Sequence, residues 1–553
     1  MKNTFRVWAR KSMGLFTILT LLFGVVGCSS ESDDSGSGSG TDTGSAGSDT
    51  GIITVATTDK LTALDPAGSF DNGSLQVKIQ VFPQLFNYDH ETKAIAPDLA
   101  ISGEYTSPDV YIVKMKPDLK WSDDSPLTSE DVKFSFDRMI AINDENGPAS
   151  LLTNLVEVTT PDESTVEFKL ANQNDVVFQS ILSSPAGFIV PKAVFAADKL
   201  TDEETIVNAG VFAGQYKIKT FKANEFIEFE VNPNYAGIWG PAQSSDVQLT
   251  YLAEASNLKL GIANGDFDVA YCTLSPSDIE DLRSNQDVKV VQGLGGEERY
   301  IVFNIELLPF GAKTDTADPA KALAVRQAIA HLVDRNQIAE TVYKNTYTPL
   351  YSALTDGLPG AVTSYKDLYG DGQGGPDLEK AKAVIEAAGI QTPIELKLQY
   401  NSDHYGASSV DEYGLIKNQL EASGLFSVDL QGTEWGTYVK ERFDSYPAYQ
   451  LGMFPDYPDP DNGLSARFTK ENILNNGYYN EEVDNLISAE QTELDQTKRI
   501  SILEEIQTLV AQDVPILPLL QGDQIAVVRA NIEGADKILD PAFKFTFGYL
   551  TKS

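Results

Sequence analysis

The sequence predicts an α/β fold with two lobes, and three observations carry that prediction. The 553-residue chain is far longer than the roughly 250–300 residues at which one hydrophobic core stops growing. Its first half is rich in short apolar runs that favour strands, whereas the part after about residue 305 shows helical periodicity among shorter strands. No repeat with a period of about 20–50 residues is visible, which argues against solenoids and propellers.

The N-terminal segment 1–27 has the composition of an export signal. Residues 1–12 carry four bases and no acid, and the apolar stretch that follows is shorter than the ~20 residues of a membrane-spanning helix. Its end, Val25 to Cys28, resembles the lipobox of bacterial lipoproteins, which implies that Cys28 is lipidated. An ordinary secretory peptide, in which Cys28 has no role, is the alternative.

Residues 28–50 are predicted to be a flexible, lipid-anchored linker. After Cys28 the segment contains one apolar side chain, Ala46, so it cannot bury enough surface to offset the entropy of ordering. A Gly/Ser-type chain of this length spans roughly 25 Å.

Strands and helices are then expected in a definite order. Apolar alternation at 52–56, 111–115, 165–170 and 226–231 predicts strands, and a further strand is expected at 394–400. Thr128 can cap a helix whose acids lie in the first turn. Later helices are indicated by apolar residues spaced by three and four within 322–333 and 500–510.

Composition excludes several classes of function. The 80 acidic and 42 basic residues give a net charge of −38, which repels nucleic acid and anionic lipid. The two cysteines, Cys28 and Cys272, and three scattered histidines offer no zinc or haem spacing, so neither a metal nor a cofactor is expected.

No motif supports catalysis. The glycines at 370–375 match the spacing of a dinucleotide-binding loop, but no strand leads into them and Pro376 follows, which favours a surface turn. No nucleophile elbow occurs in the folded region, and an excess of acids makes any carboxylate pair uninformative. We therefore expect that the protein is not an enzyme. An exported hydrolase is a remote alternative.

The most informative loop is 451–462, with the sequence LGMFPDYPDPDN. Met453, Phe454 and Tyr457 surround Asp456 in a segment stiffened by prolines. A carboxylate in such an apolar setting would attract a ligand ammonium far more strongly than it would in water. The alternative is a turn whose acids point outward.

This loop resembles the solute-contacting loop of the peptide-binding family of extracytoplasmic solute-binding proteins, which serve oligopeptide, dipeptide and nickel ABC importers, and other stretches agree across nearly all of Ile53 to Leu520. The similar segments follow in order across Ile53 to Leu520, at 96–100, 120–136, 214–216, 232–235, 264–268 and 325–330. Two departures lie in the first lobe. Asp123-Asp124-Ser125 replaces the usual Asp-Gly, and Tyr235-Ala236-Gly237 replaces the usual Tyr-Trp-Gly.

This resemblance implies the large peptide-binding type of the periplasmic-binding-protein-like fold, with an extra subdomain in lobe I. Lobe I is expected at 51–304, lobe II at 305–521, and a C-terminal return to lobe I at 522–553. The crossings near Asn304 and Gln521 are the expected hinges.

The resemblance also implies roles for individual residues. Asp456 matches the acid that anchors a peptide's α-amino group, and Trp435 matches a pocket tryptophan. Arg442 is a candidate for gripping a ligand carboxylate. Gln450 stands where the oligopeptide binders carry an arginine, which leaves carboxylate recognition open.

The expected function is that of a monomeric, lipid-anchored receptor on the outer face of the cytoplasmic membrane. It would capture di- or oligopeptides between its lobes and deliver them to ABC permease subunits. Two alternatives stay open: a non-peptide solute, such as an oligosaccharide or a metal chelate, and a receptor for signalling peptides.

Overall fold

The structure, a computed structural model, describes residues 51–244, 246–271 and 274–553. The predicted signal segment, the linker with its lipidation site Cys28, and Cys272 lie outside the described residues. Among the described helices, none is both long enough and apolar enough to cross a membrane.

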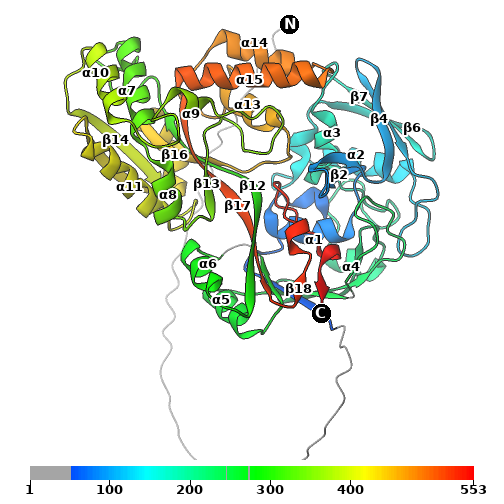
Figure 1. The fold of residues 1–553 in the computed structure, drawn as a ribbon. Helices are drawn as coiled ribbons and strands as arrows, with labels where there is room; N and C mark the ends of the chain where they lie inside the picture. The colour runs from blue at the N-terminus through cyan, green and yellow to red at the C-terminus, as the bar shows by residue number, and fades with distance from the viewer. Residues whose placement is uncertain (1–50, 245, 272–273) are drawn as a thin grey trace, which may run out of the picture. The chain divides into compact units, whose positions relative to one another are not determined.

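Two long antiparallel strands, β12 (Val288–Phe303) and β17 (Ile516–Arg529), form a ribbon that belongs to both halves of the molecule (Figure 1). The start of β12 pairs with the end of β17 in lobe I, and the end of β12 pairs with the start of β17 in lobe II. The register shifts between Gly293 and Glu297, where the ribbon passes from one lobe to the other. The chain therefore crosses between lobes inside continuous strands. The lobe limits expected at Asn304 and Gln521 stay predictions.

Lobe I extends the sheet from β17 in the order β11-β1-β10-β9-β8, with β1 parallel to both of its neighbours. Alternate residues of these strands pack into one apolar core with α1 and the C-terminal segment. The strands predicted at 52–56 and 226–231 are confirmed. The elements are β1 (Ile53–Thr57), α1 (Asn72–Val81), α4 (Glu203–Ala209), β8 (Tyr216–Lys222), β9 (Phe226–Val231), β10 (Val247–Tyr251), α5 (Ala255–Asn264), β11 (Val269–Tyr271), α6 (Pro276–Arg283), β18 (Ile532–Glu533) and β19 (Thr551–Lys552).

An extra subdomain interrupts lobe I, as expected. Its four-stranded antiparallel sheet has the order β4-β5-β7-β6 and carries its own apolar cluster. The backbone amide of Thr128 donates to the Asp131 carboxylate at 3.0 Å, which confirms the predicted helix start. The elements are β2 (Phe86–Asp89), β3 (Ala94–Pro97), β4 (Ala100–Ser107), β5 (Val110–Met115), α2 (Ser129–Ile142), β6 (Leu155–Asp162), β7 (Thr165–Leu170) and α3 (Phe178–Ile181).

Lobe II extends the ribbon on its other side in the order β12-β16-β14-β15, and helices cover this sheet. The glycines at 370–375 form a turn between α9 and α10, as predicted. The elements are α7 (Pro319–Leu332), α8 (Arg335–Thr341), β13 (Tyr347–Pro349), α9 (Ser364–Leu368), α10 (Leu378–Ala387), β14 (Ile394–Asn401), α11 (Ser409–Ala422), β15 (Phe426–Thr433), α12 (Trp435–Ser445), β16 (Ala448–Met453), α13 (Pro460–Phe468), α14 (Glu481–Glu490) and α15 (Gln496–Asp513).

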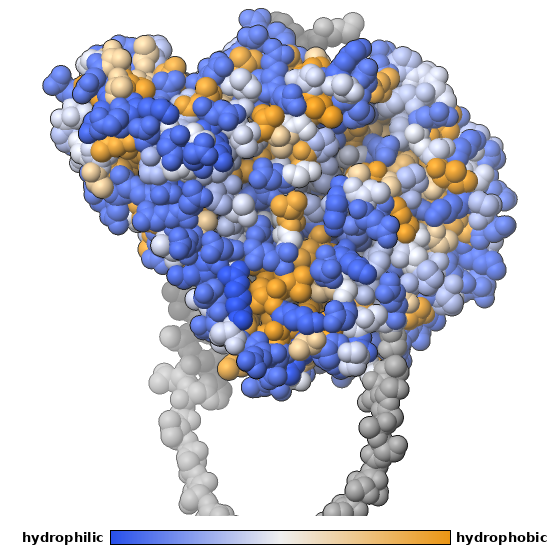
Figure 2. Space-filling model, viewed as in Figure 1, coloured by the Kyte–Doolittle hydropathy of each residue, from blue (hydrophilic) through white to orange (hydrophobic). Residues whose placement is uncertain are grey.

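The excess of acidic over basic residues agrees with the many hydrophilic residues on the face drawn in Figure 2. Figure 2 shows hydrophobic residues gathered over the lower part of the ribbon, between α6 and the C-terminal segment, whereas hydrophilic residues cover most of the rest of that face.

Candidate functional site

The ribbon borders a cleft formed by two adjoining cavities. The larger cavity, of about 480 Å³, takes its walls from both lobes. The smaller one, of about 140 Å³, lies between α1, the C-terminal segment and the loop after β16. Asn72 and Phe543 line both cavities, so we treat the two as one cleft.

Asp456 lies in the smaller cavity, in the middle of the loop that joins β16 to α13. Its side chain is half-buried, and Asn462 fixes it by donating from Nδ2 to a carboxylate oxygen at 3.1 Å. Burial raises the pKa of Asp456, and the hydrogen bond from Asn462 only partly opposes that rise. Among the described residues no cation pairs with this carboxylate. The loop therefore presents an acid that lacks a positive partner.

The side chains that neighbour Asp456 in the sequence pack in different parts of the structure. Phe454 is 43% exposed, lines the same cavity and packs against the Phe543 ring. Met453 packs instead against the lobe II core. Tyr457 is 8% exposed and belongs to the apolar cluster of the lobe I subdomain, so its side chain fastens the loop of one lobe to the core of the other. Sequence reasoning grouped these residues, but the structure separates them.

Trp435 and Arg442 both lie on α12, away from the walls of the two cavities. The indole of Trp435 stacks on His404 at 3.9 Å and touches the edge of Tyr405, which does line the larger cavity. The Arg442 guanidinium lies over the Phe443 ring. In this arrangement Trp435 packs against the cleft residue Tyr405, and Arg442 lies outside the walls of both cavities.

Gln450 is fully buried and its hydrogen bonds are internal. Its Oε1 accepts from the Asn401 amide at 2.9 Å, and its Nε2 donates to the Ser409 hydroxyl at 3.0 Å. It does not line the cleft. The position that holds an arginine in the oligopeptide binders therefore serves here to connect β14, β16 and α11.

Sequence reasoning missed Arg299, which comes from β12 and lines the larger cavity. The side chain is buried, and its Nη2 lies 2.7 Å from Glu297 and donates to the Tyr347 hydroxyl at 3.2 Å. The sequence did contain a signal for Arg299, which follows two acids and directly precedes the apolar run YIVF. A charged residue next to a run that is expected to be buried must itself find a partner.

Arg299 also faces Glu412, a buried carboxyl group on α11. Burial raises the pKa of Glu412 to about 7, although Arg299 and the hydroxyl of Tyr343, at 2.9 Å, partly oppose the rise. Burial alone would lower the pKa of Arg299, but Glu297 and the surrounding tyrosines and acids raise it overall. The guanidinium therefore stays charged beside the cavity.

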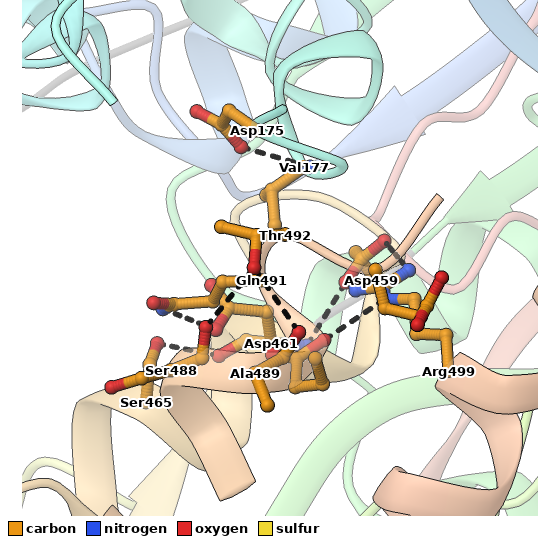
Figure 3. Close-up of polar contacts among 12 residues, drawn as sticks. Asp175, Val177, Asp459, Asp461, Ser465, Ser488, Ala489, Gln491, Thr492 and Arg499 are labelled. Carbon is orange, nitrogen blue, oxygen red and sulfur yellow. Dashed lines mark hydrogen bonds and ion pairs between the residues drawn. The ribbon is translucent and has the colours of Figure 1, made fainter. Parts of the chain in front are cut away.

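A buried polar network holds the far end of the same loop (Figure 3). Asp459 accepts two hydrogen bonds from Arg499, at 2.7 and 3.1 Å, and Asp461 accepts one from the Gln491 side chain at 2.8 Å. The backbone carbonyl of Gln491 in turn accepts from the Val176 amide of the lobe I subdomain at 3.1 Å. The loop that carries Asp456 is thus anchored at both ends.

No group of histidine, cysteine, aspartate and glutamate side chains within the described part of the chain is arranged to hold a metal ion. The described walls of the cleft combine apolar and charged side chains and hold no arrangement of a nucleophile and a base.

Comparisons with known proteins agree with this architecture. A family model described as bacterial extracellular solute-binding proteins, family 5 Middle, matches residues 94–475. The dipeptide-binding protein DppE of Bacillus subtilis is 24% identical over 563 residues, covering 97% of this chain and 97% of its own. The murein tripeptide-binding protein MppA, in its unliganded open form, has a TM-score of 0.77 at 20% identity, covering 91% of this chain and 97% of that one.

A dipeptide-binding protein of Pseudoalteromonas sp. SM9913, in complex with Met-Leu, has a TM-score of 0.67 at 18% identity, covering 91% of this chain and 100% of that one. These likenesses confirm the two-lobed fold, and the family match confirms that the protein is no enzyme. The chain belongs to family 5 of the bacterial extracellular solute-binding proteins, the substrate-binding proteins of ABC importers.

Proposed function

We propose that this chain captures di- or oligopeptides in its cleft and that Asp456 holds the peptide's α-amino group. Two findings support a peptide as the ligand. The chain belongs to family 5, and DppE, a relative of nearly equal length, is named as a dipeptide-binding protein. The geometry of Asp456 supports the choice of anchor.

The observation that carries this proposal is the unpaired Asp456 carboxylate. It is half-buried in the cleft, its pKa is raised by burial, and among the described residues it has no cationic partner. A ligand ammonium would supply the missing charge, and the pair would gain strength from partial exclusion of water. Phe454 beside it would cover the bound amine with an apolar surface.

We also propose that the receptor is tethered to the outer face of the cytoplasmic membrane through lipid on Cys28 and acts as a monomer. It would deliver its ligand to ABC permease subunits. A ligand favours closure only if it binds the closed form better, so it must touch both lobes. The larger cavity, with walls from each lobe, offers that contact.

The test is Asp456→Asn, measured by calorimetry with an equimolar tripeptide library in free-amine and N-acetylated forms. Loss of one partner of a desolvated charge pair costs about 2–5 kcal/mol, so we expect the free-amine library to bind at least about 30-fold more weakly. N-acetylation should weaken binding to the unmodified protein but add nothing in the variant.

The matched control is Asp137→Asn, which removes an exposed carboxylate from α2. Its affinity should match that of the unmodified protein. An Asp456→Asn variant that binds within twofold of the unmodified protein would contradict the assignment of the amine anchor. If no peptide binds, native mass spectrometry of protein purified without added ligand would show whether an oligosaccharide or a metal chelate occupies the cleft instead.

A further inference from the structure

A second large cavity lies outside the ligand cleft, and the proposed function makes no use of it. Its volume is about 600 Å³, which exceeds that of either cavity of the cleft, and within the described part of the chain it shares no wall residue with them. The walls come from the β2–β3 hairpin of the lobe I subdomain, the ribbon, the C-terminal segment and lobe II. Asp456 lines the cleft and Pro458 lines this cavity, so the loop after β16 borders both.

Apolar side chains form much of the wall of this second cavity. Leu294 lies in the irregular part of the ribbon and is 52% exposed, although it is a large apolar residue. Ile95, Leu358 and Leu539 line the same cavity from three other segments of the chain. Cavities of roughly 300–1,000 Å³ with apolar walls and a few polar groups are typical of sites for small organic molecules.

Asp356 supplies a carboxylate to this wall that lacks a partner among the described residues. Burial raises the pKa of Asp356, and no hydrogen bond to the carboxylate opposes the rise. The backbone of Asp356 is fixed, because its amide donates to Oε1 of Gln521 at 2.7 Å and its carbonyl accepts from Nε2 of the same side chain at 3.3 Å. Gln521 belongs to β17, so the carboxylate is held close to the ribbon.

The charges in the described walls favour a cationic ligand over an anionic one. Arg499 is already neutralised, since its Nη1 and Nη2 both donate to Asp459, at 3.1 and 2.7 Å. Lys93 is the other cation in these walls, and two carboxylates, those of Asp356 and Asp536, line the cavity with it. A ligand anion would meet this excess of acids, whereas an ammonium would be attracted.

We propose that the second cavity binds a small organic cation, whose apolar body packs against Leu294 and Leu358 and whose ammonium pairs with Asp356. This site is separate from the peptide cleft, and its existence does not depend on the proposed function. The exposed leucine and the unpaired carboxylate are then two parts of one site, and the ligand covers both.

The experiment is a calorimetric titration with butylamine, hexylamine and octylamine, and with octanol and octanoate as probes of the same chain length. Apolar walls should raise the affinity with each added methylene group, by up to about fourfold per group. A partly exposed ion pair should make octylamine bind about threefold more tightly than octanol. Octanoate should bind more weakly than octanol.

Two substitutions of exposed residues separate the charge from the apolar contact. Asp356→Asn should remove the preference for octylamine over octanol and keep the dependence on chain length. Leu294→Asn should weaken octylamine and octanol alike, by at least about threefold. The matched controls are Asp137→Asn on α2 and Leu260→Asn on α5, which replace exposed residues outside the cavity and should keep all affinities within twofold.

The cleft carboxylate of Asp456 could also attract an amine, so the titrations are repeated with Asp456→Asn. Octylamine affinity should stay within twofold in that variant. A loss of affinity there would place the amine in the cleft and overturn the second site. Affinity that does not depend on chain length would indicate general attraction to an acidic surface and would overturn it too.

Two further results would contradict this inference. Equal binding of octylamine and octanoate would exclude a role for Asp356. A dimer in light scattering that Leu294→Asn dissociates would mean that a second copy of the chain covers the leucine. Neither result bears on whether the cleft binds peptides.

Discussion

At the scale of single residues, the loop after β16 divides its side chains between the ligand cleft and the protein core. Asp456 and Phe454 line a cavity, whereas Tyr457, the next residue along, is buried in the apolar cluster of the lobe I subdomain. The backbone bends at Asp456 and Tyr457, and their side chains enter different surroundings, so one loop both presents the acid and fixes its position. The position of the acid thus depends on the packing of the tyrosine.

Replacement of Tyr457 tests that division. We expect Tyr457→Ala to lower the free energy of unfolding by about 3–5 kcal/mol, the range for removing a buried aromatic ring. Tyr457→Phe keeps the ring and should cost less than about 1.5 kcal/mol, with peptide affinity within twofold. Guanidinium unfolding and calorimetry measure the two effects. A large loss of affinity in a stable Tyr457→Phe variant would show that the hydroxyl binds ligand.

At the scale of elements, the ribbon of β12 and β17 decides how the lobes join. The ribbon is continuous, but its register is interrupted between Gly293 and Glu297, and Gly295 lies in that interruption. A Cβ on Gly295 would come 2.1 Å from the carbonyl oxygen of Gly522 on the facing strand. The strands can approach this closely only because residue 295 has no side chain.

Gly295→Ala should therefore separate the strands locally. Because backbone must shift to relieve the contact, we expect the free energy of unfolding to fall by about 1–3 kcal/mol. Gly414→Ala is the matched control, since that glycine lies inside α11 with open space around it. The control should gain up to about 1 kcal/mol. If Gly295→Ala and the unmodified protein had equal denaturation midpoints, the two strands would be able to separate at residue 295 without loss of stability, which would contradict this prediction.

At the scale of the whole molecule, a buried network in which acids outnumber bases lies where lobe II contacts the lobe I subdomain through Gln491 and Val176. Asp459 and Glu490 both accept hydrogen bonds from Arg499, whose Nε donates to Glu490 at 2.9 Å, and Asp461 lies beside Glu490. Burial, followed by the charge of Asp461, raises the pKa of Glu490 to about 9. The folded protein therefore keeps a proton that the unfolded chain releases above about pH 4.5.

This proton makes stability depend on pH. Because the pKa of Glu490 is higher in the folded state, its contribution is greatest below pH 4.5 and is lost as the pH rises to about 9. We expect Glu490→Gln to flatten the decline in unfolding free energy between pH 5 and about 9, by up to about 1.4 kcal/mol per pH unit. Denaturant titrations at several pH values measure the slope, with the exposed Glu482→Gln as control. Parallel curves for the Glu490→Gln variant and the unmodified protein would refute the assignment.

Much of the fold could be predicted from sequence because local pattern and tertiary environment agree in it. The alternating runs at 52–56 and 226–231 are strands, and Thr128 begins a helix. Each depends on side-chain periodicity or a cap within a few residues, which the chain carries locally. Asp456 could be singled out for the same reason, since the prolines and aromatics around it are its neighbours in sequence.

The sequence by itself determined the number of lobes, the family and the acid that we propose as the amine anchor. Only the tertiary structure decided which charges face the cleft. Arg299 lines it together with Gln524 of β17, because the pairing of β12 with β17 brings residues about 225 positions apart to the same wall, whereas Gln450 and Arg442 make other contacts. Strand pairing between distant segments is set by the whole core, so no local pattern reveals it.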